Sequence, residues 1–155
     1  HGVTVGKIGA GERLYGETWS MECLYPVKNS YSEDKNESST VGQLTYEDFS
    51  MLLTGDLGFD GEEALLQTDS LEDVDVWKVS HHGSKYSGSE EFLEVIRPNL
   101  SIVSVGKNSY GHPSEELLKR LNSIGSLVKT TLDGGALMLE SDGDTFTLSL
   151  QRGGD

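Results

Sequence analysis

Two apolar runs of this 155-residue chain end on side chains that bind metal ions in proteins. Residues 49–54 are followed by Asp56, and residues 74–79 are followed by His81 and His82. A carboxylate with a neutral imidazole suits zinc, manganese or iron. If the two runs form neighbouring strands, Asp56 and one of the histidines could reach the same ion. The pattern therefore favours a hydrolytic metal site.

Each of these side chains has a structural alternative. An aspartate after a strand is often a turn or capping residue, and the histidine pair could be one packed and one exposed side chain. His81, His82 and His112 are three of the four histidines and lie close together in the sequence, whereas the fourth is His1. This clustering favours the metal site over the alternatives.

Two polar loops have the composition of phosphate-binding segments. Ser84 and Lys85 belong to one loop, and Lys107, Asn108 and His112 belong to the other. Each loop leads into a predicted helix, where backbone N–H groups, hydroxyls and a cation can receive a phosphate. Ser84, Lys85 and Asn108 are therefore candidate phosphate- or substrate-binding residues. The alternative for each loop is an ordinary strand–helix connection, with His112 near a helix N-cap.

Other chemistries fit the sequence poorly. The chain lacks a Gly-x-Ser-x-Gly nucleophile motif, and Ser84 follows the histidines too closely for a catalytic triad. The single cysteine, Cys23, lies in a predicted strand and suits a core position. No apolar run approaches the length of a membrane span. The formal net charge of -14 repels nucleic acid in general, but residues 77–112 carry more cations than anions.

The surrounding pattern predicts the elements that would position these side chains. Capping-box pairs at Asp60 and Glu63 and at Ser87 and Glu90 predict two helix starts, and Pro113 suits the first turn of a third helix. Residues 28–39 are predicted to be a polar loop. Strands are predicted at residues 19–25, 40–46, 48–54, 74–79 and 100–105, with three more between 127 and 150.

This alternation of strands and helices predicts one α/β, or layered α+β, domain over residues 1–155 with a mixed β-sheet.

The motifs "VDVWKVSHHGSKYSGSEEFLEVIRPNLSIVSVGKNSYGHPSEELLKRL" and "SSTVGQLTYEDFSMLLTGDL" resemble the metallo-β-lactamase-like domain of ComEC-type competence (DNA-uptake) proteins. The resemblance implies an αββα sandwich in which water activated by metal ions attacks an ester, amide or phosphodiester. It matches Asp56 to the metal-bridging aspartate and one of His81 and His82 to the last histidine ligand. We prefer His81 as the ligand because it comes first after the strand. His82, His112 and Lys107 are then candidate catalytic residues.

The chain departs from that family in one respect, because no His-x-His-x-Asp-His motif precedes Asp56. We expect the chain to correspond to the C-terminal half of the sandwich. A divalent metal, zinc or manganese, is expected in an intact parent domain, whereas this chain alone has too few ligands for a closed site. It is then expected to bind no metal and to be inactive by itself. Half a sandwich also exposes an apolar face that favours a homodimer.

The leading functional hypothesis is part of a metal-dependent hydrolase that cleaves single-stranded DNA during uptake. The parent would be a bacterial membrane protein, with this soluble domain on its extracytoplasmic face and membrane contact only through segments outside the chain. One alternative is a non-catalytic module for nucleic-acid binding or assembly. Another is a metallo-hydrolase of a small-molecule ester.

Overall fold

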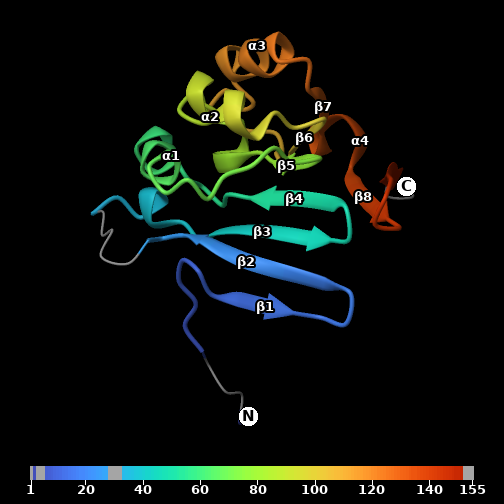
Figure 1. Ribbon diagram of the computed structural model, residues 1–155. Coiled ribbons are helices and arrows are strands. Elements are labelled where there is room, and N and C mark those ends of the chain that lie inside the picture. Colours follow the sequence, from blue (N-terminus) through green and yellow to red (C-terminus); the bar gives the residue numbers. More distant parts are fainter. Residues whose placement is uncertain (1, 3–5, 28–32, 152–155) are drawn as a thin grey trace.

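The computed structural model describes residues 2, 6–27 and 33–151 (Figure 1). Within these residues a seven-stranded sheet runs in the order β1 to β7, and β8 and β9 form a separate hairpin. The strands are β1 (Arg13–Tyr15), β2 (Trp19–Tyr25), β3 (Val41–Tyr46), β4 (Phe49–Leu53), β5 (Val76–Lys78), β6 (Leu100–Val103), β7 (Leu127–Thr130), β8 (Ala136–Ser141) and β9 (Phe146–Gln151). The helices are α1 (Phe59–Leu66), α2 (Glu90–Ile96), α3 (Glu115–Ser123) and α4 (Thr131–Gly134), with 3₁₀ turns at Asn36–Ser38 and Ser80–Gly83.

The sheet is mixed, as the sequence predicted. Strands β1 to β4 pair antiparallel, whereas β4, β5, β6 and β7 pair parallel. Leu53 lies opposite Lys78, and Lys78 lies opposite Ile102. The carboxyl ends of β4, β5 and β6 therefore meet at one edge, which is where ligands bind in open α/β sheets. The prediction of a layered α/β fold is confirmed.

Two apolar clusters cover opposite faces of the parallel strands. On one face, α1, α2 and α3 lie together over the sheet (Figure 1), and fully buried Trp77 meets Phe92 with ring centroids 5.7 Å apart. On the other face, the β8–β9 hairpin packs on Val76, Leu100 and Ile102. The period-two alternation of β5 assigns Val76 to the hairpin side and Trp77 to the helix side.

The predicted capping box of α1 is wrong. The N-cap is Gly58, and no side chain of the helix itself caps it. Instead, the Glu37 carboxylate accepts a hydrogen bond of 2.7 Å from the Gly61 N–H. A carboxylate from a segment distant in sequence thus replaces the local pair of Asp60 and Glu63. Residues 28–32 of the predicted polar loop lie outside the described residues.

The predicted starts of α2 and α3 are each displaced. Ser89, not Ser87, is the N-cap of α2 and accepts a hydrogen bond from the Phe92 N–H. The Ser87 hydroxyl is buried and donates to backbone carbonyls of the preceding loop. Ser114 is the N-cap of α3, so Pro113 precedes the helix rather than opening it. Tertiary contacts of the buried loop, absent from the local pattern, set these boundaries.

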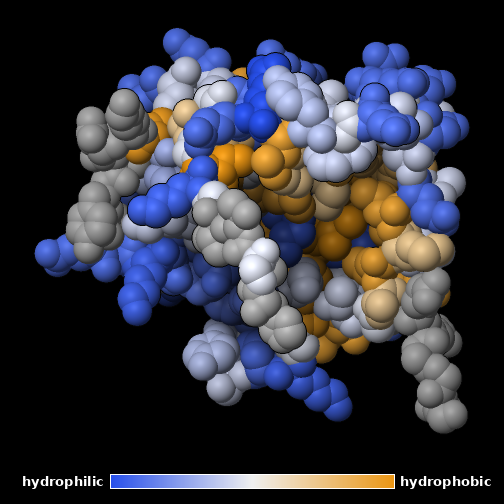
Figure 2. Space-filling model, turned by 90° about the horizontal axis from the view of Figure 1, so that it is seen from below, coloured by the Kyte–Doolittle hydropathy of each residue, from blue (hydrophilic) through white to orange (hydrophobic). Residues whose placement is uncertain are grey.

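Beyond the hairpin, the same face of the sheet is hollowed into an apolar groove of about 630 Å³. Figure 2, a view from below, shows apolar side chains in orange gathered in a hollow of the surface. The groove is lined by Thr18, Trp19, Met21, Leu44, Tyr46, Phe49, Met51, Ile102, Leu137, Leu139 and Ser141. An apolar face was expected from the sequence, and the homodimer that it would favour stays a prediction. No helix in the described part of the chain is long and apolar enough to cross a membrane.

The strand end at Thr54 provides a test of this architecture. The buried Thr54 hydroxyl donates to the Lys78 carbonyl and accepts hydrogen bonds from the Trp77 indole and the Ser80 hydroxyl. Thr54→Val leaves the indole N–H buried without a partner, so we expect a loss of about 1–3 kcal/mol in the free energy of unfolding by urea denaturation. Thr147→Val, at an exposed strand position, should change it by less than about 0.5 kcal/mol. Equal effects would contradict this role.

Candidate functional site

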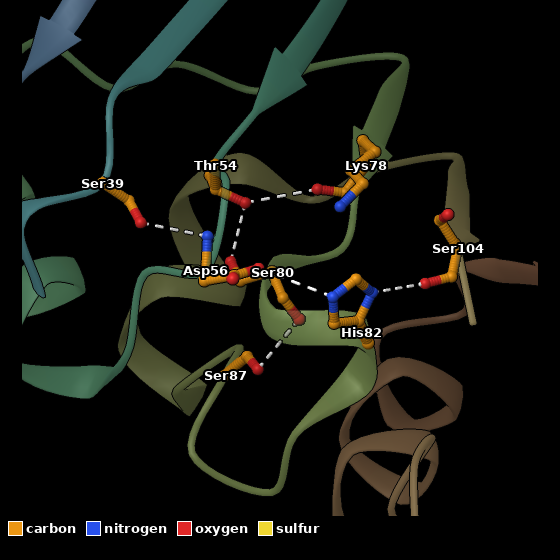
Figure 3. A network of polar contacts seen from close by, with 8 residues as sticks. All are labelled: Ser39, Thr54, Asp56, Lys78, Ser80, His82, Ser87 and Ser104. Carbon is orange, nitrogen blue, oxygen red and sulfur yellow. Dashed lines mark hydrogen bonds and ion pairs between the residues drawn. The ribbon is translucent and has the colours of Figure 1, made fainter. Parts of the chain in front are cut away.

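Asp56 and His82 face one another at the carboxyl edge of the parallel strands (Figure 3). His82 Nε2 lies 3.9 Å from Asp56 Oδ1, and about half of each side chain is exposed to solvent. Asp56 follows β4, and its backbone N–H donates to the Ser39 hydroxyl at 3.1 Å. His82 follows β5. The two strands therefore bring together one carboxylate and one imidazole, as the sequence predicted for Asp56 and one member of the histidine pair.

The orientation of His82 is fixed by the residue that follows β6. His82 Nδ1 lies 2.7 Å from the Ser104 carbonyl oxygen. A carbonyl can only accept, so Nδ1 carries the proton and donates it. In the neutral ring, the Nε2 lone pair is then directed at Asp56. A histidine that binds metal through one nitrogen commonly donates from the other to a carbonyl or carboxylate.

Both histidines lie on strained backbone. His81 has φ 47° and His82 has φ 54°, in the left-handed region that non-glycine residues seldom adopt. Gly83 follows with φ 85°, and a Cβ there would lie 2.8 Å from the Pro113 side chain. Hydrogen bonds hold this turn, from the His81 N–H to the Gly55 carbonyl and from the Ser114 N–H to the Gly83 carbonyl. Strain held in this way is typical of functional sites.

His81 and His112 form a second contact beside the first. Their ring centroids are 5.9 Å apart in a T-shaped arrangement, and the Tyr110 ring stacks on His112 at 6.0 Å. His112 Nδ1 is buried and has no hydrogen-bond partner within the described residues. Burial, together with the proximity of His81 and His82, lowers the pKa of His112. The structure thus brings all three predicted histidines into one cluster.

The pairing in the structure reverses our preference between His81 and His82. The sequence favoured His81 as the metal ligand because of its position in the chain. The structure instead pairs His82 with Asp56 and packs His81 against His112. Residue order could not reveal this, because the left-handed turn decides which imidazole faces the carboxylate. His82 is therefore the histidine placed to share an ion with Asp56, and the ligand role of either histidine stays a prediction.

The Asp56–His82 pair fits a metal ion as part of a ligand set. Oxygen and nitrogen ligands bind zinc at about 2.0–2.2 Å, so two donors 3.9 Å apart can both contact one ion. The described residues hold no group of three or more His, Cys, Asp or Glu side chains placed to bind a metal.

Lys78 adds a cation that the sequence did not single out. It ends β5 and is half-buried beside Asp56 (Figure 3). Burial lowers the pKa of Lys78, and the nearby Asp56 carboxylate partly offsets that effect. A half-buried lysine in a strand next to Asp56 is suited to meet an anionic ligand. Its position within an apolar strand concealed it in the sequence.

The loop predicted to bind phosphate through its backbone is instead bound by the protein's own carboxylate. Glu62 of α1 is fully buried and accepts hydrogen bonds from the Gly88 N–H at 2.6 Å and the Ser89 N–H at 2.8 Å. These N–H groups precede α2, where an external anion was expected. They are therefore not free for a phosphate, and no sequence motif indicated this partner.

Arg120 of α3 holds the carbonyl groups of the same loop. Its guanidinium donates to the backbone oxygens of Lys85, Ser87 and Gly88 at 2.8, 2.9 and 2.6 Å. Glu62 and Arg120 together fix the segment that follows the two histidines. We call this arrangement the Glu62–Arg120 clamp.

The remaining predicted substrate-binding residues differ in their exposure to solvent and in the hydrogen bonds that they make within the protein. Lys85 and Lys107 are exposed, whereas Ser84 is buried and accepts a hydrogen bond from the Tyr86 N–H. The Asn108 amide makes four hydrogen bonds within its own loop, from its NH₂ group to the Gly106 and His112 carbonyls and from the Tyr110 and His112 N–H groups to its oxygen. Asn108 thus shapes the loop, and the binding roles of all these residues stay predictions.

Comparisons with known proteins agree with the motifs. No family model matches the chain. It is 32% identical over 150 residues to "ComE operon protein 3" of Bacillus subtilis, covering 96% of this chain and 19% of that protein. It is 35% identical over 144 residues to "Recombination protein 2" of Haemophilus influenzae, covering 92% and 18%.

"Competence protein ComA" of Neisseria gonorrhoeae is 35% identical over 128 residues, covering 81% of this chain and 18% of that protein. The chain resembles ComEC-type competence proteins. The predicted resemblance is therefore confirmed over most of the chain. The chain spans less than a fifth of the length of each relative.

The clamp predicts a pH-dependent stability. Burial raises the pKa of Glu62 from 4.5 to about 7, although the two N–H donors and Arg120 oppose the shift. The stability contributed by Glu62 is then fully present below about pH 4.5 and is lost as the pH rises through about 7. We expect the advantage of wild type over Glu62→Gln in free energy of unfolding to fall by up to about 1.4 kcal/mol per pH unit in this window.

Urea denaturation at several pH values measures this difference. Glu63→Gln is the matched control, because Glu63 is the exposed neighbour on the same helix. Its difference from wild type should stay flat over the same window. A pH-independent difference for Glu62→Gln would contradict the titration of this buried carboxylate.

Proposed function

We propose that this chain is part of a metal-dependent phosphodiesterase that acts on single-stranded DNA in competence-type DNA uptake. One relative is named "Competence protein ComA" and another "ComE operon protein 3", and these names support the role in uptake. The chain spans less than a fifth of the length of those proteins. The activity of a whole relative is therefore only a proposal for this chain. The geometry of Asp56 and His82 supports the catalytic part of the proposal.

The observation that carries the proposal is the pairing of Asp56 with an oriented His82. Asp56 contributes a carboxylate oxygen, and His82 contributes the Nε2 that the Ser104 carbonyl leaves free. In this proposal both are ligands of one divalent cation, zinc or manganese, which completes its ligand set from outside the described residues. When bound, such a cation supplies Lewis acidity and lowers the pKa of a coordinated water.

Cations of this chain would receive the phosphodiester. Lys78 stands beside Asp56, and Lys85 and Lys107 are exposed on the loops around the histidines. A positive side chain near a phosphate neutralises charge that increases during phosphoryl transfer. This local supply of cations matters because the whole chain carries a formal net charge of -14 and repels a strand elsewhere on its surface.

His112 has the chemistry of a proton carrier next to the pair. Its lowered pKa keeps the ring neutral near pH 7, so it can accept a proton.

In the cell, we place the chain on the extracytoplasmic face of a bacterial membrane protein, where incoming DNA arrives. The name "Competence protein ComA" supports the link to DNA uptake, and the membrane face is part of our proposal. The membrane contact would be made by segments outside this chain.

Cleavage of a fluorescent single-stranded oligonucleotide with Mn²⁺ or Zn²⁺ by the full-length gene product tests the function. Asp56→Asn and His82→Asn should each lower the rate by about 100-fold or more, because each removes a candidate ligand. Asparagine suits position 82 because it tolerates a left-handed backbone. Asp144→Asn, in the exposed β8–β9 turn, is the matched control and should leave the rate unchanged.

Unchanged cleavage in the Asp56 and His82 variants would contradict the assignment of these two residues as metal ligands. Metal-independent DNA binding with no cleavage would favour the nucleic-acid-binding module instead. Hydrolysis of small esters with no action on DNA would favour the alternative of a metallo-hydrolase of a small-molecule ester.

A further inference from the structure

A cleft of about 530 Å³ opens beside His112, whose ring contacts His81. Its residues come from the loop before α2, from the loop between β6 and α3, and from the start of α3. The lining includes two exposed tyrosines, Tyr86 at 59% and Tyr110 at 82% of their surface, together with exposed Lys85. Two exposed aromatic rings that share one cleft point to a ligand-binding surface, because apolar groups gathered in a groove often mark binding sites.

Each ring is supported from behind by another side chain. Tyr86 meets Phe59 edge-on at 6.2 Å, and the Lys85 ammonium lies 5.0 Å from the Tyr86 ring centroid. Tyr110 stacks on His112 with an angle of 27° between the rings. The rings are therefore held in place and remain open to solvent.

The loops that carry the rings are also fixed. The Glu62–Arg120 clamp holds the backbone around Tyr86, and the Asn108 amide accepts a hydrogen bond from the Tyr110 N–H. A ligand that stacks on these rings would lose little binding energy to ordering them, because the loops are already ordered.

The charges in the cleft select what can stack there. Glu115 and Glu116 line the same cleft and are exposed. Two carboxylates repel a phosphate, but they can accept hydrogen bonds from a neutral base. Lys85 is the cation of the lining and can meet the phosphate attached to that base. The cleft is thus suited to a flat, neutral, aromatic group on an anionic strand.

We propose that the Tyr86–Tyr110 cleft is a subsite that stacks an unpaired base of single-stranded DNA next to the Asp56–His82 pair. The proposal rests on the proposed function for its ligand, since that function brings the strand to this edge of the sheet. Stacking on aromatic side chains tolerates any base. A stacked base would hold the strand in place without reading its sequence.

The test measures binding by fluorescence anisotropy in EDTA at about 50 mM salt, with labelled oligothymidylate and with an abasic oligomer of equal length as probes. Without a metal, no cleavage competes with binding. Oligothymidylate should bind more tightly than the abasic oligomer. Tyr86→Ala and Tyr110→Ala should each weaken oligothymidylate binding about five- to thirtyfold and leave the abasic oligomer nearly unaffected.

Two sets of variants separate stacking from other effects. Tyr86→Phe and Tyr110→Phe keep the ring and should retain the binding. Tyr15→Ala removes a tyrosine that is 72% exposed on β1, away from the cleft, and should bind like wild type. Circular dichroism confirms that each variant is folded.

Equal binding of the two oligomers, no saturable binding, or the same loss in Tyr15→Ala would overturn the proposal. Failure of the subsite proposal can be distinguished from failure of the proposed function. Base stacking without metal-dependent cleavage would contradict the proposed nuclease function and support the subsite. Metal-dependent cleavage that is unaffected in both tyrosine variants would support the nuclease function and contradict the subsite.

Discussion

The parallel pairing of β4, β5 and β6 is the constraint on which the candidate site depends. The register places Leu53 beside Lys78 and Lys78 beside Ile102, so the residues that follow each strand emerge at one edge. Asp56 follows the first strand, His82 the second and Ser104 the third. Each supplies one component: a carboxylate, an imidazole and the carbonyl that orients it. A shift of one residue would turn every side chain of a strand to the opposite face.

The loops around this edge are rigid because the protein satisfies their polar groups itself. The Glu62–Arg120 clamp binds both the N–H groups and the carbonyls of one loop, and the Asn108 amide closes the other. A buried carboxylate occupies the position where a substrate phosphate was expected. The surfaces left for a ligand are therefore side chains, namely imidazoles, lysines and exposed tyrosine rings. That distribution is consistent with a site that meets a strand's phosphates through lysines and its bases through tyrosine rings.

The sequence missed β1 and the short α4, but it predicted the order of β2 to β9 and of α1 to α3, the mixed sheet and the convergence of Asp56 with the histidines. It did so because apolar runs and strand ends are local features with a fixed geometric meaning. It could not predict that His82 and not His81 faces Asp56, because that depends on two left-handed residues. Nor could it predict Glu62, whose partners lie on a loop beyond the next strand. The capping pair at Asp60 and Glu63 failed for the same reason, since Glu37 acts from a distant segment.

The most direct test of the central claim is the affinity of the full-length gene product for Mn²⁺, measured by electron paramagnetic resonance. The account predicts that Asp56→Asn and His82→Asn each weaken Mn²⁺ binding at least about tenfold, because each removes a ligand. His81→Asn, at the neighbouring left-handed position, should bind Mn²⁺ nearly as well as wild type. Loss of binding in the His81 variant with normal binding in the His82 variant would contradict the account.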